Sequence, residues 1–216
     1  MEGNPAGQAE LERLGIRLVP AVAVGARAVH GWNPEGYAAL LGVEYRPAPR
    51  LAPAALAARL DRILATAERL VACLPEPLMG WKPPQRDRSL RDLGYHLFRV
   101  GLAFADAMHS GALPEGWLQE TAPAGLSDGP ALARYAALVR ERLTGWFEGA
   151  GGGEYERVIS VYYGPQSGHD LLERTTWHAA QHLRQLHALA IACGITPPDP
   201  LPVADFEGLP LPASLW

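Results

Sequence analysis

Two histidines, His178 and His182, lie one helical turn apart in the stretch TTWHAAQHLRQL, residues 175–186. In a helix, side chains four residues apart share a face with about 5–6 Å between their Cβ atoms, so both imidazoles can point at one site. A buried imidazole without a hydrogen-bond partner costs about 1–3 kcal/mol. We therefore expect polar partners or a metal ion at this pair, because neutral imidazole is a common ligand of divalent metals.

His96 is a third candidate ligand, in the stretch SLRDLGYHLFRV, residues 89–100. It lies about 60° from the centre of the apolar stripe of its helix at 100° per residue, close enough to the core margin to reach a neighbouring helix. Three imidazoles leave at least one coordination position open, as in catalytic zinc sites. We predict that His96, His178 and His182 bind one divalent metal ion.

Several chemistries remain open at such a site. The spacing is not the HExxH motif of zinc proteases, because Ala179 stands where that motif has its glutamate. A metal with an open position can turn a bound low-molecular-weight thiol into a nucleophilic thiolate, or a bound water into hydroxide. The first reaction makes a transferase and the second a hydrolase. A metal that only stabilises the fold, in a stress or interaction protein without turnover, is the third alternative.

Apolar residues recur every three or four positions in four long segments, which is typical of helices packed in a bundle. The spacing predicts helices over residues 53–74, 89–108, 127–147 and 168–194, and Ser89 with Asp92 resembles a capping box at the start of the second. The predicted fold class is therefore mainly α, an up-and-down four-helix bundle over residues 55–194. The residues expected to point inward from the third helix are Leu132, Tyr135, Val139, Leu143 and Trp146.

The rest of the chain has a different pattern. Residues 1–46 predict a small α/β piece with a helix at 8–15, strands at 16–24 and 26–32, and a helix at 33–42 that begins with Asn33 and Pro34. Prolines make residues 47–54 a stiff linker, and residues 195–216 a tail that we expect to wrap the surface in extended form. A short extended piece is expected at residues 157–164, before the fourth helix.

The helical part resembles the DinB-like superfamily, which includes bacillithiol transferases and mycothiol-dependent maleylpyruvate isomerases. The resemblance covers residues 51–194 and is most specific around SLRDLGYHLFRV and LLERTTWHAAQHLRQL. His96, His178 and His182 match the three metal-ligand positions of the family, all filled by histidine here. The resemblance implies a four-helix bundle, often a homodimer, with zinc or nickel, and points to thiol transfer onto an electrophilic small molecule.

The N-terminal piece is similar to the C-terminal half of a glutaredoxin, through the stretch LGIRLVPAVAVGARAVHGWNPEGYAALLGV, residues 14–43. Val19-Pro20 would match the cis-proline of that fold. The half that carries the CxxC motif is absent, so no thiol-disulfide chemistry is carried over. A thiol-recognising surface and a packing module both remain open, and we favour the packing module because half a sheet has strand edges that must be covered.

Composition excludes several classes. The net charge of −4 and the pI near 6.0 disfavour a nucleic-acid partner, which requires a basic face. No stretch approaches the roughly 18 apolar residues of a membrane span, and the N-terminal residues do not have the pattern of a signal peptide, so we expect a cytoplasmic protein without a membrane partner. Cys73 and Cys193 lie within apolar helical patterns and are expected to be buried thiols.

The remaining histidines and one arginine have simpler expected roles. We expect His30, His109, His169 and His187 to be solvated. Arg184 follows His182 closely and either orients an anionic substrate or forms a surface ion pair, which we favour. Trp177 precedes the first ligand of the fourth helix and is a candidate wall of the site.

Overall fold

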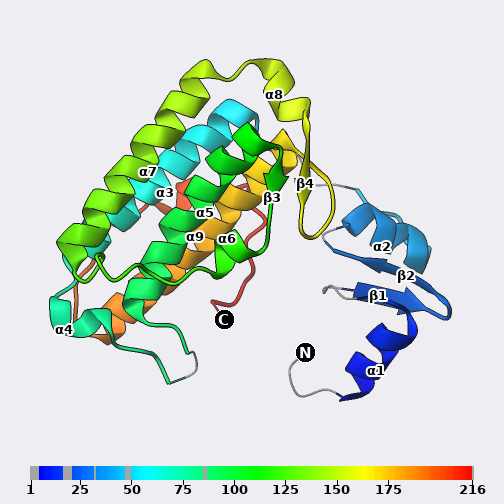
Figure 1. Ribbon diagram of the computed structural model, residues 1–216, viewed down its shortest axis with the longest axis horizontal. Coiled ribbons are helices and arrows are strands. Elements are labelled where there is room, and N and C mark those ends of the chain that lie inside the picture. The colour runs from blue at the N-terminus through cyan, green and yellow to red at the C-terminus, as the bar shows by residue number, and fades with distance from the viewer. Residues whose placement is uncertain (1–4, 17–20, 32, 47–49, 85–86, 216) are drawn as a thin grey trace. The chain divides into compact units, whose positions relative to one another are not determined.

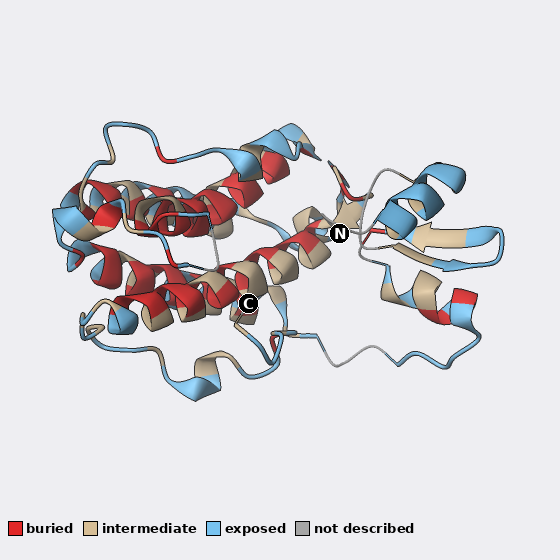
Figure 2. Cartoon of the chain, turned by 90° about the horizontal axis from the view of Figure 1, so that it is seen from below, coloured by how far each residue is buried: buried red, intermediate tan, exposed pale blue. Residues whose placement is uncertain are grey.

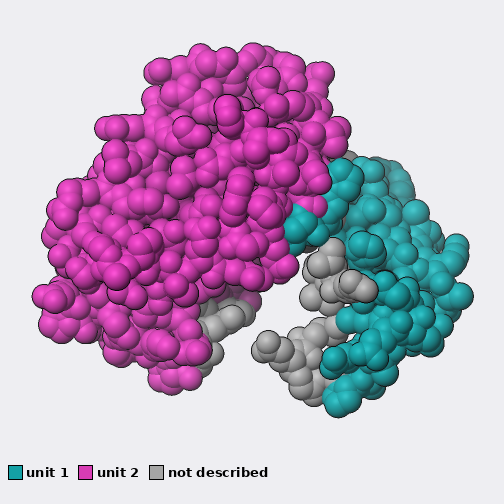
Figure 3. Space-filling view, viewed as in Figure 1, with its two compact units in different colours: residues 1–50, 162–165 teal, residues 51–161, 166–216 magenta. Residues whose placement is uncertain are grey.

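The chain forms two compact units, each described by itself below (Figure 3). The first comprises residues 1–50 with 162–165, and the second, the helical unit, comprises residues 51–161 with 166–216. The computed structural model describes the whole chain except residues 1–4, 17–20, 32, 47–49, 85–86 and 216.

Four long helices dominate the helical unit (Figure 1). Polar N-cap side chains mark where three of them begin, at Ser89, Asp128 and Ser167. Ser89 Oγ accepts a hydrogen bond from Asp92 N at 3.1 Å, as the capping pattern predicts. A full capping box of Ser167 and Asp170 begins the last long helix. The mainly α-helical prediction is confirmed. The four helices are α3 (Pro53–Ala72), α5 (Leu90–Ser110), α7 (Gly129–Gly149) and α9 (Gly168–Ala192).

The inner faces of these helices form one apolar core (Figure 2). Burying a large aliphatic side chain contributes about 1.5–3 kcal/mol, so these faces supply most of the driving force for packing. Tyr135 and Trp146 of α7, both expected to point inward, are half-buried. Each packs on a ring of α5: Tyr135 on Tyr95, with ring centroids 5.3 Å apart, and Trp146 on the buried Phe104, at 5.0 Å. The buried seam residues of α3 are Leu56, Leu60, Ile63, Ala67 and Leu70.

The predicted up-and-down order of the helices is wrong, because α5 and α7 run in the same direction. Gly94, near the start of α5, lies against Leu132, near the start of α7. Toward the other end, Arg142 of α7 bonds to Asp106 of α5 at 3.3 Å. The connection between the two helices is long enough to return along the whole helix before α7 begins. A simple antiparallel order would need only a short loop.

Helix α9 runs antiparallel to α5 and in the same direction as α3. Its first turn lies beside Met108, near the end of α5, since a Cβ on Gly168 would approach the Met108 side chain. The same turn lies beside the start of α3, because His169 Nε2 is 2.9 Å from the carbonyl oxygen of Leu51. This arrangement sets the first half of α5 against the middle of α9, where the three histidines lie.

Short elements connect the long helices. Strand β4 lies between two partners, parallel to β3 with Ala112 opposite Ser160 and antiparallel to β5 with Val158 opposite Ser167. Ser167 is also the N-cap of α9, so this small sheet fixes where α9 begins. The connecting elements are α4 (Glu76–Met79), β3 (Ala112–Leu113), α6 (Gly116–Gln119), α8 (Gly152–Glu156), β4 (Val158–Val161), β5 (Gln166–Ser167) and the 3₁₀ turn η1 (Val203–Asp205).

The first unit contains a two-stranded antiparallel hairpin between two short helices. Gly25 adopts a φ of 62° in its two-residue turn, a conformation that glycine tolerates. Asn33 Oδ1 accepts a hydrogen bond from Gly36 N at 2.8 Å and caps the second helix, with Pro34 in its first turn as predicted. Val19-Pro20, the expected cis-proline position, lies outside the described residues. The elements are α1 (Pro5–Arg13), β1 (Ala21–Val24), β2 (Arg27–His30) and α2 (Pro34–Leu41).

The segment after α9 belongs to the helical unit and follows its surface. Asp205 forms an ion pair with Arg62 of α3 at 2.5 Å, and Leu209 is buried. The predicted burial of the two cysteines is wrong: Cys73 is exposed and Cys193 is half-buried. Both are the C-terminal caps of their helices, where the chain leaves the core. Every helix in the described part of the chain is too short or too polar to span a bilayer.

Candidate metal centre

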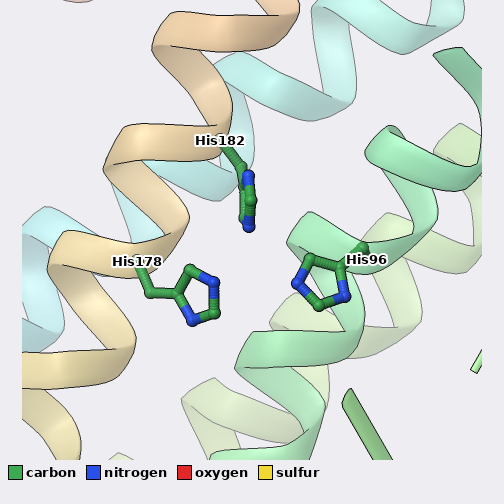
Figure 4. A group of neighbouring side chains, drawn as sticks. All are labelled: His96, His178 and His182. Carbon is green, nitrogen blue, oxygen red and sulfur yellow. The ribbon is translucent and has the colours of Figure 1, made fainter. Parts of the chain in front are cut away.

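The three predicted ligands meet between two helices: His96 comes from α5, and His178 and His182 from α9 (Figure 4). One nitrogen from each ring can be chosen so that all three lie within 4.8 Å of one another. The ring centroids of His96 and His182 are 4.8 Å apart, and those of His178 and His182 are 4.7 Å apart. Two nitrogens that bind one ion tetrahedrally at about 2.0–2.1 Å lie roughly 3.4 Å apart, so modest ring rotations suffice for a shared ion.

Burial keeps these imidazoles neutral. The pKa of His96 is lowered to about 3, mainly by burial and in addition by the electrostatic effects of His182 and Arg88. Burial also lowers the pKa of His182 to about 4, against the opposing effect of its bond to Gln185. The pKa of His178 lies well below the ordinary value for the same first reason. At neutral pH all three rings therefore offer lone pairs rather than protons.

Gln185 determines which nitrogen of His182 is available. His182 Nδ1 lies 2.8 Å from Gln185 Oε1. An amide oxygen only accepts hydrogen bonds, so Nδ1 carries the hydrogen and Nε2 keeps its lone pair. That Nε2 atom is buried, and none of the described residues gives it a hydrogen-bond partner. Metal-binding histidines commonly donate their other ring N–H to an oxygen in this way.

The donor set fits a divalent cation. The ring nitrogen of His96 that is remote from Cβ faces His178 and His182 (Figure 4), and an ion would satisfy it together with His182 Nε2, which has no hydrogen-bond partner among the described residues. Imidazole ligands suit zinc, nickel, copper and iron. In the parts of the chain that the structure describes, the group contains no fourth histidine, cysteine, aspartate or glutamate. The described residues therefore supply three ligands, one fewer than a closed tetrahedral site requires.

Positively charged and aromatic groups flank the histidines. Arg88, just before α5, lowers the pKa of all three rings, and Arg174, one turn before His178, contributes to the shift of that residue. The Arg174 guanidinium lies 5.5 Å from the centroid of the Trp177 ring, which is itself 5.8 Å from the ring of His178. No carboxylate is among the groups that shift the three pKa values in the described chain. The charges of Arg88 and Arg174 therefore act against protonation of the histidine rings.

The segment around α6 is fixed on α5 close to His96. Glu120 accepts hydrogen bonds from Arg99 Nε at 2.8 Å and from the Tyr95 hydroxyl at 3.0 Å. Arg99, only 6% exposed, also lies 5.4 Å from the centroid of the Trp117 ring. The Arg99 hydrogen bond lowers the pKa of Glu120. These contacts hold the α6 segment against α5 next to His96.

The other histidines lie outside this group, and two of them differ from expectation. His30 and His109 are exposed, as predicted. His169 is half-buried and contacts the Leu51 carbonyl, so it is not simply solvated. His187 is also half-buried, and burial lowers its pKa. Both lie on sides of α9 that face other parts of the chain, which helical periodicity alone does not reveal.

Sequence reasoning missed the roles of three residues at the site. Gln185 lies three residues after His182, which is the spacing of a helical side-chain pair and the signal that could have identified it. Arg174 lies four residues before His178, which places it on the same helical face. Arg88 has no such signal, because its proximity to the histidines depends on tertiary structure. Arg184 does not point to the site but bonds to Gln181 and to the Pro212 carbonyl.

Comparison with known proteins agrees with this fold. The sequence profile described as the DinB superfamily matches residues 44–186. A crystal structure of a DinB-like protein from Bacillus subtilis superposes with a TM-score of 0.54 at 18% identity, over 65% of this chain and 92% of that one. A search of curated proteins finds no match. Since the profile matches more than half of the residues of this chain, the chain belongs to the DinB superfamily.

Proposed function

We propose that His96, His178 and His182 hold a divalent metal ion, zinc or nickel, and that the protein is a thiol S-transferase acting on an electrophilic small molecule. The observation that carries this proposal is the convergence of three neutral imidazoles within 4.8 Å, without a fourth ligand among the described residues. A structural zinc site would be closed by a fourth protein ligand, whereas a catalytic one keeps a position for substrate.

The ion, Gln185 and the two arginines would each have a different role in such a reaction. A divalent ion there would act as a Lewis acid that lowers the pKa of a thiol to near neutrality. Gln185 holds His182 in the tautomer that offers Nε2. Arg88 and Arg174 supply positive charge that favours the thiolate over the thiol. In the transfer, a bond forms from sulfur to the electrophilic carbon, the leaving group departs with its electron pair, and the thiol proton passes to solvent.

The charge of the surroundings favours thiol transfer over hydrolysis. A metal-dependent hydrolase commonly places a carboxylate near the ion as a general base. The described groups that shift the histidine pKa values are histidines and arginines, without a carboxylate. A thiol needs no such base, because its proton is already weakly held. Trp177 adds an aromatic wall beside His178 for an organic substrate.

The test combines metal content with thiol dependence. We expect about one zinc or nickel ion per chain after purification, and loss of an electrophile such as 1-chloro-2,4-dinitrobenzene that depends on bacillithiol, mycothiol or glutathione. His178→Ala should abolish this activity, and His109→Ala, an exposed histidine at the end of α5, should retain it. A metal-loaded protein that ignores every thiol would instead be a metal-binding stress or interaction protein. Thiol-independent ester cleavage lost in His178→Ala would identify a hydrolase.

We further propose that the first unit derives from the strand–strand–helix half of a glutaredoxin-like fold and serves in packing. Strands β1 and β2 pair only with each other among the described residues, so both outer edges need a cover. A homodimer would provide one, and the mass in solution from light scattering tests it. A monomer would mean that the cover comes from the same chain.

A further inference from the structure

Gln185 lies between a proposed metal ligand and the chain segment that follows α9. Its side chain is 9% exposed. Oε1 accepts the hydrogen bond of His182 Nδ1 at 2.8 Å, and Nε2 donates to the carbonyl oxygen of Leu215 at 2.6 Å. A backbone carbonyl only accepts, so the NH₂ group of the amide must face Leu215. The oxygen is then directed at the histidine.

Two further polar side chains of α9 hold the same segment. Gln181 Nε2 donates to the carbonyl oxygens of Ser214 and Leu215, at 3.2 Å and 2.9 Å. Arg184 Nη1 donates to the Pro212 carbonyl at 2.9 Å and to Gln181 Oε1 at 2.8 Å. Three side chains within five residues of α9 therefore bind one short stretch of backbone. We call residues 212–215 the strap.

We propose that Gln185 is a positioning residue of the metal centre and that the strap acts on the centre through it. This inference rests on the proposed metal site. With the strap bound, the amide has one orientation, and His182 is held as the tautomer whose Nε2 can bind a metal. Without the strap, the amide can turn its NH₂ group toward the ring, and the histidine loses the acceptor that fixes the hydrogen on Nδ1.

Two variants of Gln185 distinguish the role of Oε1, which bonds to His182, from that of Nε2, which bonds to Leu215. Gln185→Leu removes both hydrogen bonds, and we expect zinc affinity to fall about 10- to 100-fold, the usual effect of removing such a partner. Gln185→Glu keeps an acceptor for His182 Nδ1 but cannot donate to Leu215, so its zinc affinity should equal or exceed that of the wild type. Gln8→Leu, an exposed glutamine on α1, is the matched control and should leave the affinity unchanged.

The second part of the experiment removes the strap and measures the effect on zinc affinity. A chain that ends at Leu209 keeps the buried Leu209 side chain and the Arg62–Asp205 ion pair. It lacks the strap and therefore every hydrogen bond that the strap accepts from Gln181, Arg184 and Gln185. We expect this truncation to weaken zinc binding about 3- to 10-fold in the wild-type background and not at all in Gln185→Leu or Gln185→Glu. Such a cycle isolates the coupling between the strap and Gln185. An equal loss in all three backgrounds would overturn the proposal.

A metal-independent readout distinguishes failure of this inference from failure of the proposed function. In the metal-free wild type, ¹⁵N imidazole NMR should show His182 protonated on Nδ1, and Gln185→Leu should lose that preference. Zinc competition with a chromophoric chelator then measures affinity. A wild type that binds neither zinc nor nickel refutes the proposed function. A wild type that binds zinc, with the same affinity and the same His182 tautomer in Gln185→Leu, refutes the positioning role alone.

Discussion

His96 on α5 faces His182 on α9 with their ring centroids 4.8 Å apart and their planes at 77°. An edge-to-face pair of neutral imidazoles, one of them with a buried Nε2 that has no hydrogen-bond partner among the described residues, has little reason to exist in an apolar core. The antiparallel packing of α5 and α9 brings the two rings together, and a shared cation explains why polar rings occupy this position.

Replacement of His96 should remove metal binding without unfolding the protein. We expect His96→Ala to lower zinc affinity by at least about 100-fold, more than the loss of a residue that merely supports a ligand. Zinc should raise the melting temperature of the wild type, because a ligand that binds only the folded state stabilises it, and should leave the variant unchanged. Thermal unfolding with and without zinc measures both effects. His109→Ala on the same helix should behave as the wild type, and equal zinc stabilisation of His96→Ala would contradict the site.

The metal-free protein should lose stability as the pH falls below about 6.5. The folded-state pKa is about 3 for His96 and about 4 for His182, whereas the ordinary value is 6.5. Between these values the unfolded chain takes up protons that the folded chain excludes, so the free energy of unfolding decreases with decreasing pH. Each histidine that stays neutral contributes a slope approaching about 1.4 kcal/mol per pH unit.

Urea unfolding in the presence of a chelator, between pH 7 and pH 5, measures this slope. His96→Gln should remove the contribution of one histidine, whereas the exposed His30→Gln should leave the slope as it is. An unchanged slope in His96→Gln would show that His96 does not exclude protons in the folded state.

The sequence predicts the elements of the helical unit better than their directions. Periodicity identifies which face of a helix is buried, and Ser89 and Asp170 mark where helices begin. Neither signal depends on whether a helix runs up or down. The connection between Ser110 and Gly129 could join two antiparallel helices at the same end, with extra residues looping out. It could equally run back along α5, so that α7 begins beside the start of α5, and only tertiary packing decides between these paths. The result is the parallel pair α5 and α7.

At the site, too, the sequence reveals local features but not those that depend on tertiary packing. The three histidines carry their own signal, because two of them share a helical face and the third lies at a core margin. The partner of His182 also lies within one turn, in Gln185. The contribution of Arg88 and the contact of Gln185 with Leu215 join segments that are far apart in sequence. No local pattern in the sequence reports such contacts.

Removal of the charge of Arg88 should weaken thiol binding more than metal binding. Because Arg88 disfavours protons on all three histidines, its positive potential extends over the whole centre and should attract a thiolate. We expect Arg88→Gln to raise the KM for the thiol about 3- to 10-fold, up to 1.4 kcal/mol, with a weaker dependence on salt than the wild type. Arg91→Gln, a neighbouring half-buried arginine that does not shift these pKa values in the described chain, is the control. An unchanged KM in Arg88→Gln would exclude a role in substrate binding.

Two glycines of α7 should respond in opposite ways to alanine. A Cβ on Gly129 would lie 2.3 Å from the carbonyl oxygen of Val71 and 2.8 Å from that of Leu74, both in the backbone, so the start of α7 must move away from the end of α3. We expect Gly129→Ala to lower the free energy of unfolding by about 2–4 kcal/mol, in the range of overpacked cores. Gly145 is exposed one turn before the end of the same helix with nothing within 4 Å of a Cβ, and Gly145→Ala should raise stability by about 0.5–1 kcal/mol through helix propensity. Urea unfolding of both variants measures the difference, and a Gly129→Ala protein as stable as the wild type would show that α7 does not approach the α3 backbone this closely.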